Sequence, residues 1–545
     1  MSGAGFSEAV REHPRVDTQP SAVAPAEALE RFGAAELARG IAGGRWSASD
    51  VVAAHIARIE AVDPKLNAVV VRRFEAARAE AELADAAVRA GAPLGPLHGV
   101  PITIKEQFAL AGTPATIGVA GARDDVQDGP LVARLRAAGA IVLGKTNVPQ
   151  LLIYNEADNP VYGRTNNPWN MERSSGGSSG GEAAIIAACG SPLGLGSDIG
   201  GSLRAPSHAC AIASLKPTTN RLSNEDARGS GFAEGQIAIV SQPGPMARRV
   251  EDLVLAMRVL AAPGQERFDS AVPPIPWREP GEVDVAGLRI GTYDDDGFFP
   301  SSPAVKRAVA ESAAALRALG ADVVSFAPPD VGQAIETFMA ILAADGARSA
   351  KRRLGTGARD RRVNGLLQLA AIPNALRPAF VGLAAALDQR RLSRQIASIR
   401  PSSAGGFWAL VEEQNAYRRR FIGELDRLGI DVLLAPAHAL PALTHGSTYY
   451  LSTAASYSML YNLLGMPAGV VPATRVRDDE AQPRAAGRDV VDRAAAEVER
   501  GSAGLPIGVQ VVARHWREDL VLAVMARLER ALSANPGYPA LPPAL

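Results

Sequence analysis

Cysteine is scarce in this chain of 545 residues, which contains only Cys189 and Cys210. Two thiols cannot build the disulfide framework of a small secreted domain or a four-thiolate metal site. We therefore expect a cytoplasmic protein in which both cysteines are buried structural residues. The motifs H-E-x-x-H and C-x-x-C are missing as well. Nothing in the sequence thus indicates a bound metal, and we expect no cofactor.

An excess of charge of either sign is also missing, because 57 basic residues stand against 57 acidic ones. Nucleic acids and anionic membranes attract a basic surface, so a nucleic-acid partner is not expected. The first 30 residues contain no apolar stretch of the kind that a signal peptide requires. Residues 366–387 are the most apolar long stretch, but Pro373 and Arg377 interrupt them. We expect no transmembrane anchor, and this stretch suits a helical core segment better than a helix on a membrane surface.

The pattern of apolar residues predicts the fold class. Short apolar runs predict strands, and runs with apolar residues at three- and four-residue spacing predict helices. Strands are expected at residues 99–105, 140–144, 288–293, 322–326, 431–436, 468–474 and 505–512. Helices are expected through most of residues 29–90 and at 131–138, 250–260, 304–319 and 519–532. This alternation indicates an α/β fold with a central β-sheet covered by helices on both faces.

The domain organisation can be estimated from composition. Residues 1–28 are polar and rich in Pro and Ala, which predicts a flexible tail. No long linker divides the remainder, so residues 29–545 are expected to form a single large domain. Residues 334–428 are almost entirely helical in pattern and are expected to flank the sheet and to form a pocket wall. Residues 475–503 are charged and rich in Ala and Gly, which predicts a solvated surface excursion.

A segment rich in Gly and Ser, residues 174–202, stands out from the rest of the chain. It contains nine glycines and seven serines, and they bracket two apolar runs, so a flexible linker is a poor interpretation. A phosphate-binding loop would need a lysine after the glycines, and none follows. A dinucleotide-binding loop begins at Gly194 and Gly196, but Ile199 occupies the third glycine position. A serine nucleophile remains.

Two places could supply this nucleophile. Residues 176–180 satisfy G-x-S-x-G, the turn that carries the nucleophile of α/β hydrolases. That turn follows a buried strand, whereas residues 166–173 read as a polar turn. A histidine base would also be needed, and nothing marks His438, His445 or His515 for this role.

The second place is Ser202, at the end of Asp198–Ser202. Two glycines before a serine free four successive backbone N–H groups, from Ile199 to Ser202, to converge on one point. Such a cluster of donors can hold an oxyanion. Lys105 ends a strand-like run and could act as the base if burial kept it neutral, which requires a pKa shift of roughly 3 units. A serine between this lysine and the nucleophile could relay the proton.

These motifs together resemble the amidase signature family of serine hydrolases. The resemblance rests on GVPITIKEQ, GKTNVPQ, NNPWNMERSSGGSSGGE, PLGLGSDIGGSLRAPS and LKPT, and it continues through residues 241–253, 462–476 and 504–522. NRLS after KPT, and Ile199 in SDIGGS, look more like fatty-acid-amide-hydrolase-type members than like the tRNA-dependent amidotransferase subunit. The resemblance implies the amidase signature fold, with a mixed central sheet, and by analogy it suggests a homodimer.

The resemblance also implies the roles of individual residues. Ser202 matches the nucleophile, Lys105 the general base, and Ser178 the bridging serine, which follows a cis peptide bond in the family. The backbones of Ile199, Gly200, Gly201 and Ser202 match the oxyanion hole, and Asp198 and Arg204 match supports of that loop. Ser175, Ala211 and Ser214 depart from residues that are common in the family, but none of them touches the proposed chemistry.

We therefore expect an amidase that cleaves a carbon–nitrogen bond of a small amide through an acyl-enzyme on Ser202. Leu152 and Tyr154, just before the Gly/Ser segment, are expected to line the acyl pocket and to favour a hydrophobic acyl or aryl group. Two alternatives stay open: an esterase or carbamate hydrolase on the same site, and an amidotransferase A-type subunit that depends on a partner.

Overall fold

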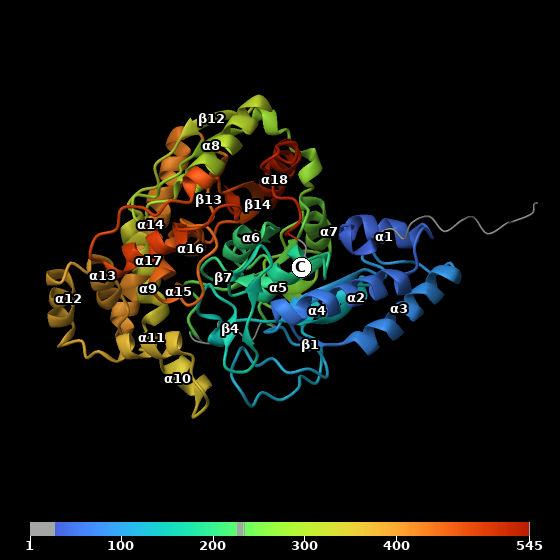
Figure 1. Cartoon of the computed structure of the whole chain (residues 1–545), viewed down its shortest axis with the longest axis horizontal. Helices are drawn as coiled ribbons and strands as arrows, with labels where there is room; N and C mark the ends of the chain where they lie inside the picture. The colour runs from blue at the N-terminus through green and yellow to red at the C-terminus, as the bar shows by residue number, and fades with distance from the viewer. Residues whose placement is uncertain (1–27, 226–232, 234, 544–545) are drawn as a thin grey trace, which may run out of the picture.

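The computed structural model describes residues 28–225, 233 and 235–543 (Figure 1). The tail expected at residues 1–28 lies outside them, apart from Ala28. Within the described chain, eleven strands form one large sheet. In spatial order these strands are β1 (Val69–Arg72), β3 (Ile141–Thr146), β2 (Pro101–Lys105), β8 (Leu193–Asp198), β10 (Gln242–Ala247), β9 (Ala213–Lys216), β14 (Ala468–Arg475), β15 (Pro506–Ala513), β13 (Val432–Pro436), β11 (Arg289–Thr292) and β12 (Asp322–Ser325).

The sheet is mixed, as the resemblance implied. Strand β2 runs parallel to both β3 and β8, and β11 runs parallel to both β12 and β13. The other neighbouring pairs are antiparallel. Because parallel strands end at the same edge of a sheet, the carboxyl ends of β2 and β8 lie together, and both lead into the segments expected to carry the chemistry.

Helices cover both faces of this sheet, which confirms the expected α/β fold (Figure 1). Helix α18 contacts α7 and α8, and these three helices contact strands β10, β14 and β15, while α5 and α6 contact each other and strands β8, β9 and β15. The helices are α1 (Ala34–Ala42), α2 (Ala48–Leu66), α3 (Phe74–Arg89), α4 (Pro130–Ala137), α5 (Gly180–Ala187), α6 (Arg204–Cys210), α7 (Val250–Leu260), α8 (Pro303–Ala318), α9 (Val331–Ala343), α10 (Arg348–Leu354), α11 (Arg361–Ala371), α12 (Arg377–Ala386), α13 (Arg390–Ser398), α14 (Ala404–Leu428), α15 (Thr448–Leu451), α16 (Ser456–Leu464), α17 (Val490–Glu499) and α18 (Glu518–Leu532).

The long apolar stretch at residues 366–387 is divided between two helices. It begins inside α11, passes through an irregular turn that contains Pro373, and ends just after α12. Among the described residues, no helix combines the length and the apolar character that crossing a membrane would require. Helices α9 to α14 lie at the same end of the molecule (Figure 1), where α9 contacts α13 and α14, and α12 contacts α13.

Several local predictions were wrong. Residues 366–387, expected to form a helical core segment, leave large apolar side chains exposed: Leu376, Phe380, Leu383 and Leu387. Residues 69–72, inside the stretch expected to be helical, form edge strand β1, which pairs with β3. Residues 166–173, expected as a polar turn, contain the small hairpin of β6 (Asn166–Asn167) and β7 (Asn170–Ser174). The excursion expected at residues 475–503 contains α17, whose buried Val491, Ala495 and Val498 pack into the protein. Its apolar residues lie on one helical face, a pattern that its high charge concealed.

Candidate active site

Strand pairing brings the predicted base next to the Gly/Ser segment. Thr103 and Ile104 of β2 pair with Gly194 and Leu195 of β8 in parallel register. Lys105 is the last residue of β2, so it lies beside the end of β8, where Ser197 and Asp198 precede the Gly-Gly turn. The two chemical motifs are about 90 residues apart in the sequence, and this sheet register places them in contact.

Lys105 is completely buried and hydrogen-bonds to hydroxyl groups. Its Nζ donates to Oγ of Ser178 at 2.7 Å and to Oγ of Ser197 at 2.9 Å. Ser197 in turn donates to Oε1 of Gln107 at 2.6 Å, which fixes the orientation of its hydroxyl. Burial lowers the pKa of Lys105 from 10.5 to about 7, although the charges of Asp198 and the nearby Glu182 act in the opposite direction. A lysine in this setting can exist as the neutral amine near neutral pH.

Ser178 and Ser202 belong to two loops that contact each other. The peptide bond between Gly177 and Ser178 is cis, as the resemblance implied. The backbone N–H of Ser179 donates to the carbonyl oxygen of Ser202 at 3.1 Å. Both hydroxyl-bearing residues are nearly buried, with exposed fractions of 2% for Ser178 and 5% for Ser202. In the described chain no hydrogen bond joins their hydroxyls directly. The structure therefore contains the hydrogen bond between Lys105 and Ser178, and Ser202 lies in the neighbouring loop.

The turn before Ser202 presents three free amides rather than the expected four. The N–H of Gly201 donates to Oδ1 of Asp198 at 2.8 Å. Within the described residues, the N–H groups of Ile199, Gly200 and Ser202 have no hydrogen-bond partner. Gly201 has φ +106°, and a Cβ there would lie 2.9 Å from Cβ of Ser458, so the turn requires glycine at this position. Sequence alone could not reveal that Asp198 engages one of the four amides.

Asp198 anchors this turn through a buried ion pair. Its carboxylate accepts hydrogen bonds from Nε and Nη2 of Arg204 at 3.0 and 2.9 Å, and neither side chain is exposed. Asn462 and Gln510, from elements near the C-terminus, bind the same two charged groups. Burial alone would raise the pKa of Asp198, but the Arg204 charge holds it well below its usual range. The sequence identified Asp198 and Arg204 as supports, and it missed the two amide side chains.

The alternative site with a histidine base is not assembled. His438 interacts with the carbonyl of Leu440, and burial lowers its pKa to about 3. His445 contacts Glu156, and His515 contacts the carbonyl of Leu464. Among the described residues, no histidine hydrogen-bonds to a serine of the Gly/Ser segment.

A largely apolar cavity of about 420 Å³ opens at Ser202. Four residues named from the sequence line this cavity. Two belong to the turn before Ser202, Ile199 and Gly200, and two precede the Gly/Ser segment, Leu152 and Tyr154. Helices α9, α11, α13 and α16 supply most of the remaining wall, including Phe338, Met339, Leu342, Leu366, Leu367, Leu369, Ala370, Leu392 and Met459. Sequence reasoning named residues 334–428 as a pocket wall without identifying these side chains.

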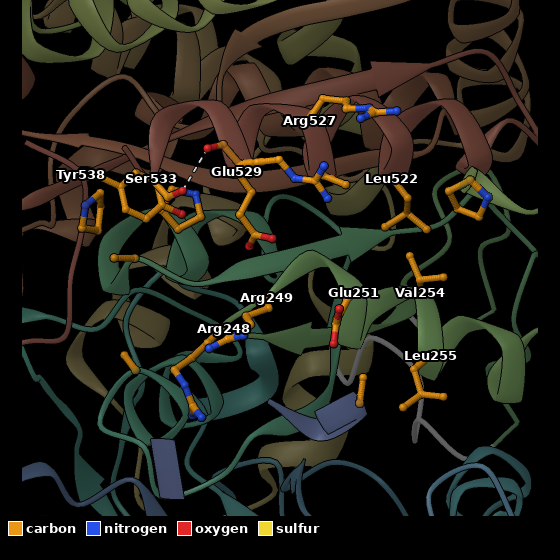
Figure 2. Close-up of a pocket in the computed structure, with 18 of the residues that line it drawn as sticks. Arg248, Arg249, Glu251, Val254, Leu255, Leu522, Arg527, Glu529, Ser533 and Tyr538 are labelled. Atoms are coloured by element: carbon orange, nitrogen blue, oxygen red, sulfur yellow. Dashed lines mark hydrogen bonds between the residues drawn. The ribbon is translucent and has the colours of Figure 1, made fainter. Parts of the chain in front are cut away.

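A wider groove lies elsewhere, between α1, α7 and α18 (Figure 2). It is rich in arginine, but several of these side chains are already engaged. Arg248 donates to four backbone carbonyls, and Arg39 pairs with Glu251 at 3.1 Å. Neither Lys105 nor a serine of the Gly/Ser segment lines this groove. The cavity at Ser202 is therefore the candidate active site.

Comparison with known proteins agrees with this geometry. The family model described as "Amidase" matches residues 50–522. The chain belongs to the amidase family. It is 38% identical to fatty-acid amide hydrolase 1 of Sus scrofa over 446 residues, which cover 81% of this chain and 76% of the relative. It is 31% identical to the A-type subunit of glutamyl-tRNA(Gln) amidotransferase from Salinispora arenicola over 542 residues, 95% of this chain and 99% of the relative.

A solved fatty acid amide hydrolase structure superposes on this amidase with a TM-score of 0.80 and 26% identity, over 93% of this chain and 86% of the other. Similarity to the fatty-acid amide hydrolases thus exceeds similarity to the amidotransferase, as the residues NRLS and Ile199 predicted. This amidase is a hydrolase that acts on amide carbon–nitrogen bonds.

Proposed function

We propose that this amidase hydrolyses hydrophobic acyl or aryl amides through a Ser202 acyl-enzyme. The observation that carries the proposal is the buried Lys105, whose Nζ lies 2.7 Å from Oγ of Ser178, beside the loop of Ser202. Neutral Lys105 accepts the Ser178 proton while Ser178 takes the proton of Ser202, and the Ser202 oxygen attacks the amide carbonyl. The protons return along the same path to the leaving amine. Water then hydrolyses the acyl-enzyme.

The backbone N–H groups of Ile199, Gly200 and Ser202 stabilise the oxyanion that forms during this attack. Preorganised backbone donors of this kind each contribute about 3–4 kcal/mol to lowering the barrier. Asp198 supports them because it binds the N–H groups of Gly201 and Leu203 and so fixes the turn.

The cavity supports the hydrophobic substrate class. Its wall is formed mainly by aliphatic and aromatic side chains, and its carboxylate, Asp345, is engaged with the backbone N–H groups of Ala347 and Ser349. Burying one methylene contributes about 0.8 kcal/mol, so kcat/KM should rise about fourfold with each carbon added to the acyl chain until the cavity is filled. The fatty-acid amide hydrolase names of the relatives agree with such a substrate.

A fluorophosphonate probe tests the site directly. Mass spectrometry of the labelled protein should find the probe on Ser202, and Ser202→Ala should abolish labelling. Ser312→Ala, which alters a buried serine in α8, serves as the control and should be labelled as the wild type is. Labelling at Ser178 or Ser179 with Ser202 unmodified would overturn the assignment.

Matched amide, ester and carbamate substrates of one acyl group test the reaction class. Faster turnover of the ester or carbamate at equal acyl binding would favour the esterase or carbamate hydrolase. If the purified chain hydrolysed no member of a broad amide panel, a partner-dependent amidotransferase subunit would be favoured instead.

A further inference from the structure

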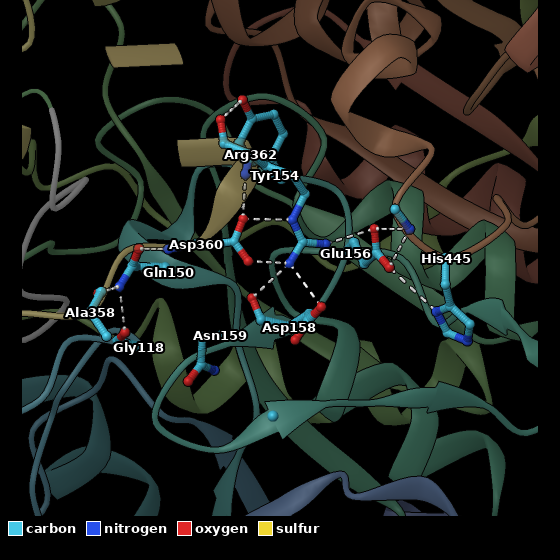
Figure 3. A network of polar contacts seen from close by, with 12 residues as sticks. Gly118, Gln150, Tyr154, Glu156, Asp158, Asn159, Ala358, Asp360, Arg362 and His445 are labelled. Carbon is cyan, nitrogen blue, oxygen red and sulfur yellow. Dashed lines mark hydrogen bonds and ion pairs between the residues drawn. The ribbon is translucent and has the colours of Figure 1, made fainter. Parts of the chain in front are cut away.

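One arginine of the helical segment binds three carboxylates (Figure 3). The guanidinium of Arg362, the second residue of α11, lies 2.8 Å from Glu156, 2.9 Å from Asp158 and 2.6 Å from Asp360. The side chains of Arg362 and Glu156 are only 6% and 1% exposed. The planar, five-donor guanidinium can bridge several carboxylates, whereas the ammonium group of a lysine acts as a single point charge.

On one side, this cluster is continuous with the wall of the acyl cavity. The hydroxyl of Tyr154 donates to the carbonyl oxygen of Arg362 at 2.9 Å, and Tyr154 also lines the cavity. Helix α11 itself supplies four further lining residues one to two turns beyond Arg362: Leu366, Leu367, Leu369 and Ala370. A group that fills the cavity therefore packs against the helix that begins at Arg362.

On the other side, the cluster contacts the loop that carries Ser178. A Cβ at Gly177 would lie only 2.4 Å from the backbone N of Glu156, so the two backbones touch. The N–H of Ala157 donates to the carbonyl oxygen of Gly176 at 3.1 Å. The residue after Gly177 is Ser178, which accepts the hydrogen bond from Lys105. The backbone of Glu156 thus packs directly against the loop that carries Ser178.

The carboxylate of Glu156 has a second set of partners in the segment between β13 and α15. It accepts the N–H of Gly446 at 2.9 Å, and its Oε1 lies 3.3 Å from Nδ1 of His445 (Figure 3). Glu156 is therefore held between α11 and the segment before α15, and together with Arg362 it links α11 to the Ser178 loop.

We propose that Arg362 is a positioning residue that couples occupancy of the acyl cavity to the placement of Ser178. An acyl chain long enough to pack against α11 stabilises the arrangement in which Ser178 bridges Lys105 and Ser202. Binding energy from the remote part of the substrate then appears in kcat rather than in KM alone. This inference rests on the proposed function.

The test compares Arg362→Lys with a matched control, Arg307→Lys. Arg307 of α8 also binds two carboxylates, those of Glu311 and Glu480 at 2.9 and 2.6 Å, and it does not line the acyl cavity. Steady-state kinetics are measured on an acetyl amide and a decanoyl amide of one amine. Arg362→Lys should lower kcat for the decanoyl amide about tenfold, and KM and the acetyl rate should stay within about twofold. Arg307→Lys should leave the ratio of the two kcat values unchanged.

A second variant keeps the test decisive if Arg362→Lys folds poorly. Glu156→Gln preserves shape and removes the charge through which Arg362 reaches the Ser178 loop, so it should cause the same selective loss. The double variant should lose no more kcat than either single variant.

Equal losses on both substrates, or a change confined to KM, would overturn the coupling. A wild-type protein that hydrolyses neither amide would instead refute the proposed function, so the two failures can be told apart.

Discussion

The amine of Lys105 hydrogen-bonds to the hydroxyls of Ser178 and Ser197, at 2.7 and 2.9 Å, and to no carboxylate of the described residues. The nearby carboxylates are engaged elsewhere. Asp198 binds Arg204, and Glu182 accepts hydrogen bonds from the hydroxyls of two threonines. A buried lysine with hydroxyl partners and no directly bound counter-ion favours its neutral form, which is the form that can accept a proton.

Replacing Lys105 by methionine should stabilise the protein. The folded state holds the pKa of Lys105 at about 7, below its unfolded value. Between these two pKa values the unfolded state binds more protons than the folded state, so the free energy of unfolding rises with pH. Lys105 therefore destabilises the folded state most below pH 7, and this destabilisation disappears as the pH rises towards about 10. Lys105→Met should raise the unfolding free energy at pH 7 by about 2 kcal/mol, after the loss of its hydrogen bonds is allowed for.

Urea unfolding of both proteins from pH 7 to pH 10 measures this difference. The difference in unfolding free energy between the variant and the wild type should become smaller towards high pH. The variant should be inactive at every pH. If the wild type were more stable than Lys105→Met at pH 7, burial of Lys105 would not destabilise the folded protein.

Replacing Ser178 by alanine should remove the proton relay and leave the cavity intact. We expect kcat to fall about 10²–10⁴-fold, the usual contribution of positioned proton transfer, with KM changed only a few-fold. Ser191→Ala, at a buried serine whose hydroxyl bonds to the carbonyl of Leu193, is the control and should retain activity. Activity of Ser178→Ala within tenfold of the wild type would exclude the relay.

Neutralising Asp198 should damage the fold and the oxyanion turn together. Asp198→Asn leaves the fully buried Arg204 without its charged partner, which should cost about 3–5 kcal/mol in urea unfolding. Glu424→Gln breaks an exposed pair with Arg427 and should cost less than about 1 kcal/mol. Equal costs for the two variants would contradict the assigned role of the buried pair.

A side chain at Gly201 should displace the oxyanion turn. Gly201→Ala places a Cβ 2.9 Å from Ser458 on a backbone at φ +106°, so the turn must move. Loss of one aligned donor typically lowers kcat about 10²–10³-fold, and a drop of that order is expected. Gly382→Ala, at a glycine of α12 with open space around it, should stay within about twofold of the wild type. Unchanged kcat in Gly201→Ala would show that the turn tolerates the side chain.

Sequence alone predicted seven of the eleven strands that form the large sheet of the described chain, because each of the seven is a short apolar run bounded by turn residues. The run at residues 431–436, for example, corresponds to β13, and 505–512 to β15. It also singled out Lys105, Ser178 and Ser202, which the structure places at the end of β2 and in two adjoining loops. Edge strand β1 was missed because its four residues lie between two long helices, α2 and α3, and are too few to show a strand period of their own.

The supporting contacts could not be predicted, because they join residues far apart in the chain. Gln510 reaches Arg204 across 306 positions, and Arg362 reaches Glu156 from another part of the chain. Engagement of the Gly201 amide by Asp198 is local, yet it depends on a side-chain rotamer that no pattern of residue types encodes.

The pH dependence of acylation shows whether neutral Lys105 is the base. The rate of Ser202 labelling by a fluorophosphonate should rise with pH through an apparent pKa near 7, the value that burial sets for Lys105, and should level off above it. Lys105→Met should label slowly, without that rise. A wild-type profile that stays flat from pH 5 to 9, or a rise through pH 7 that persists in Lys105→Met, would contradict the neutral lysine as the base.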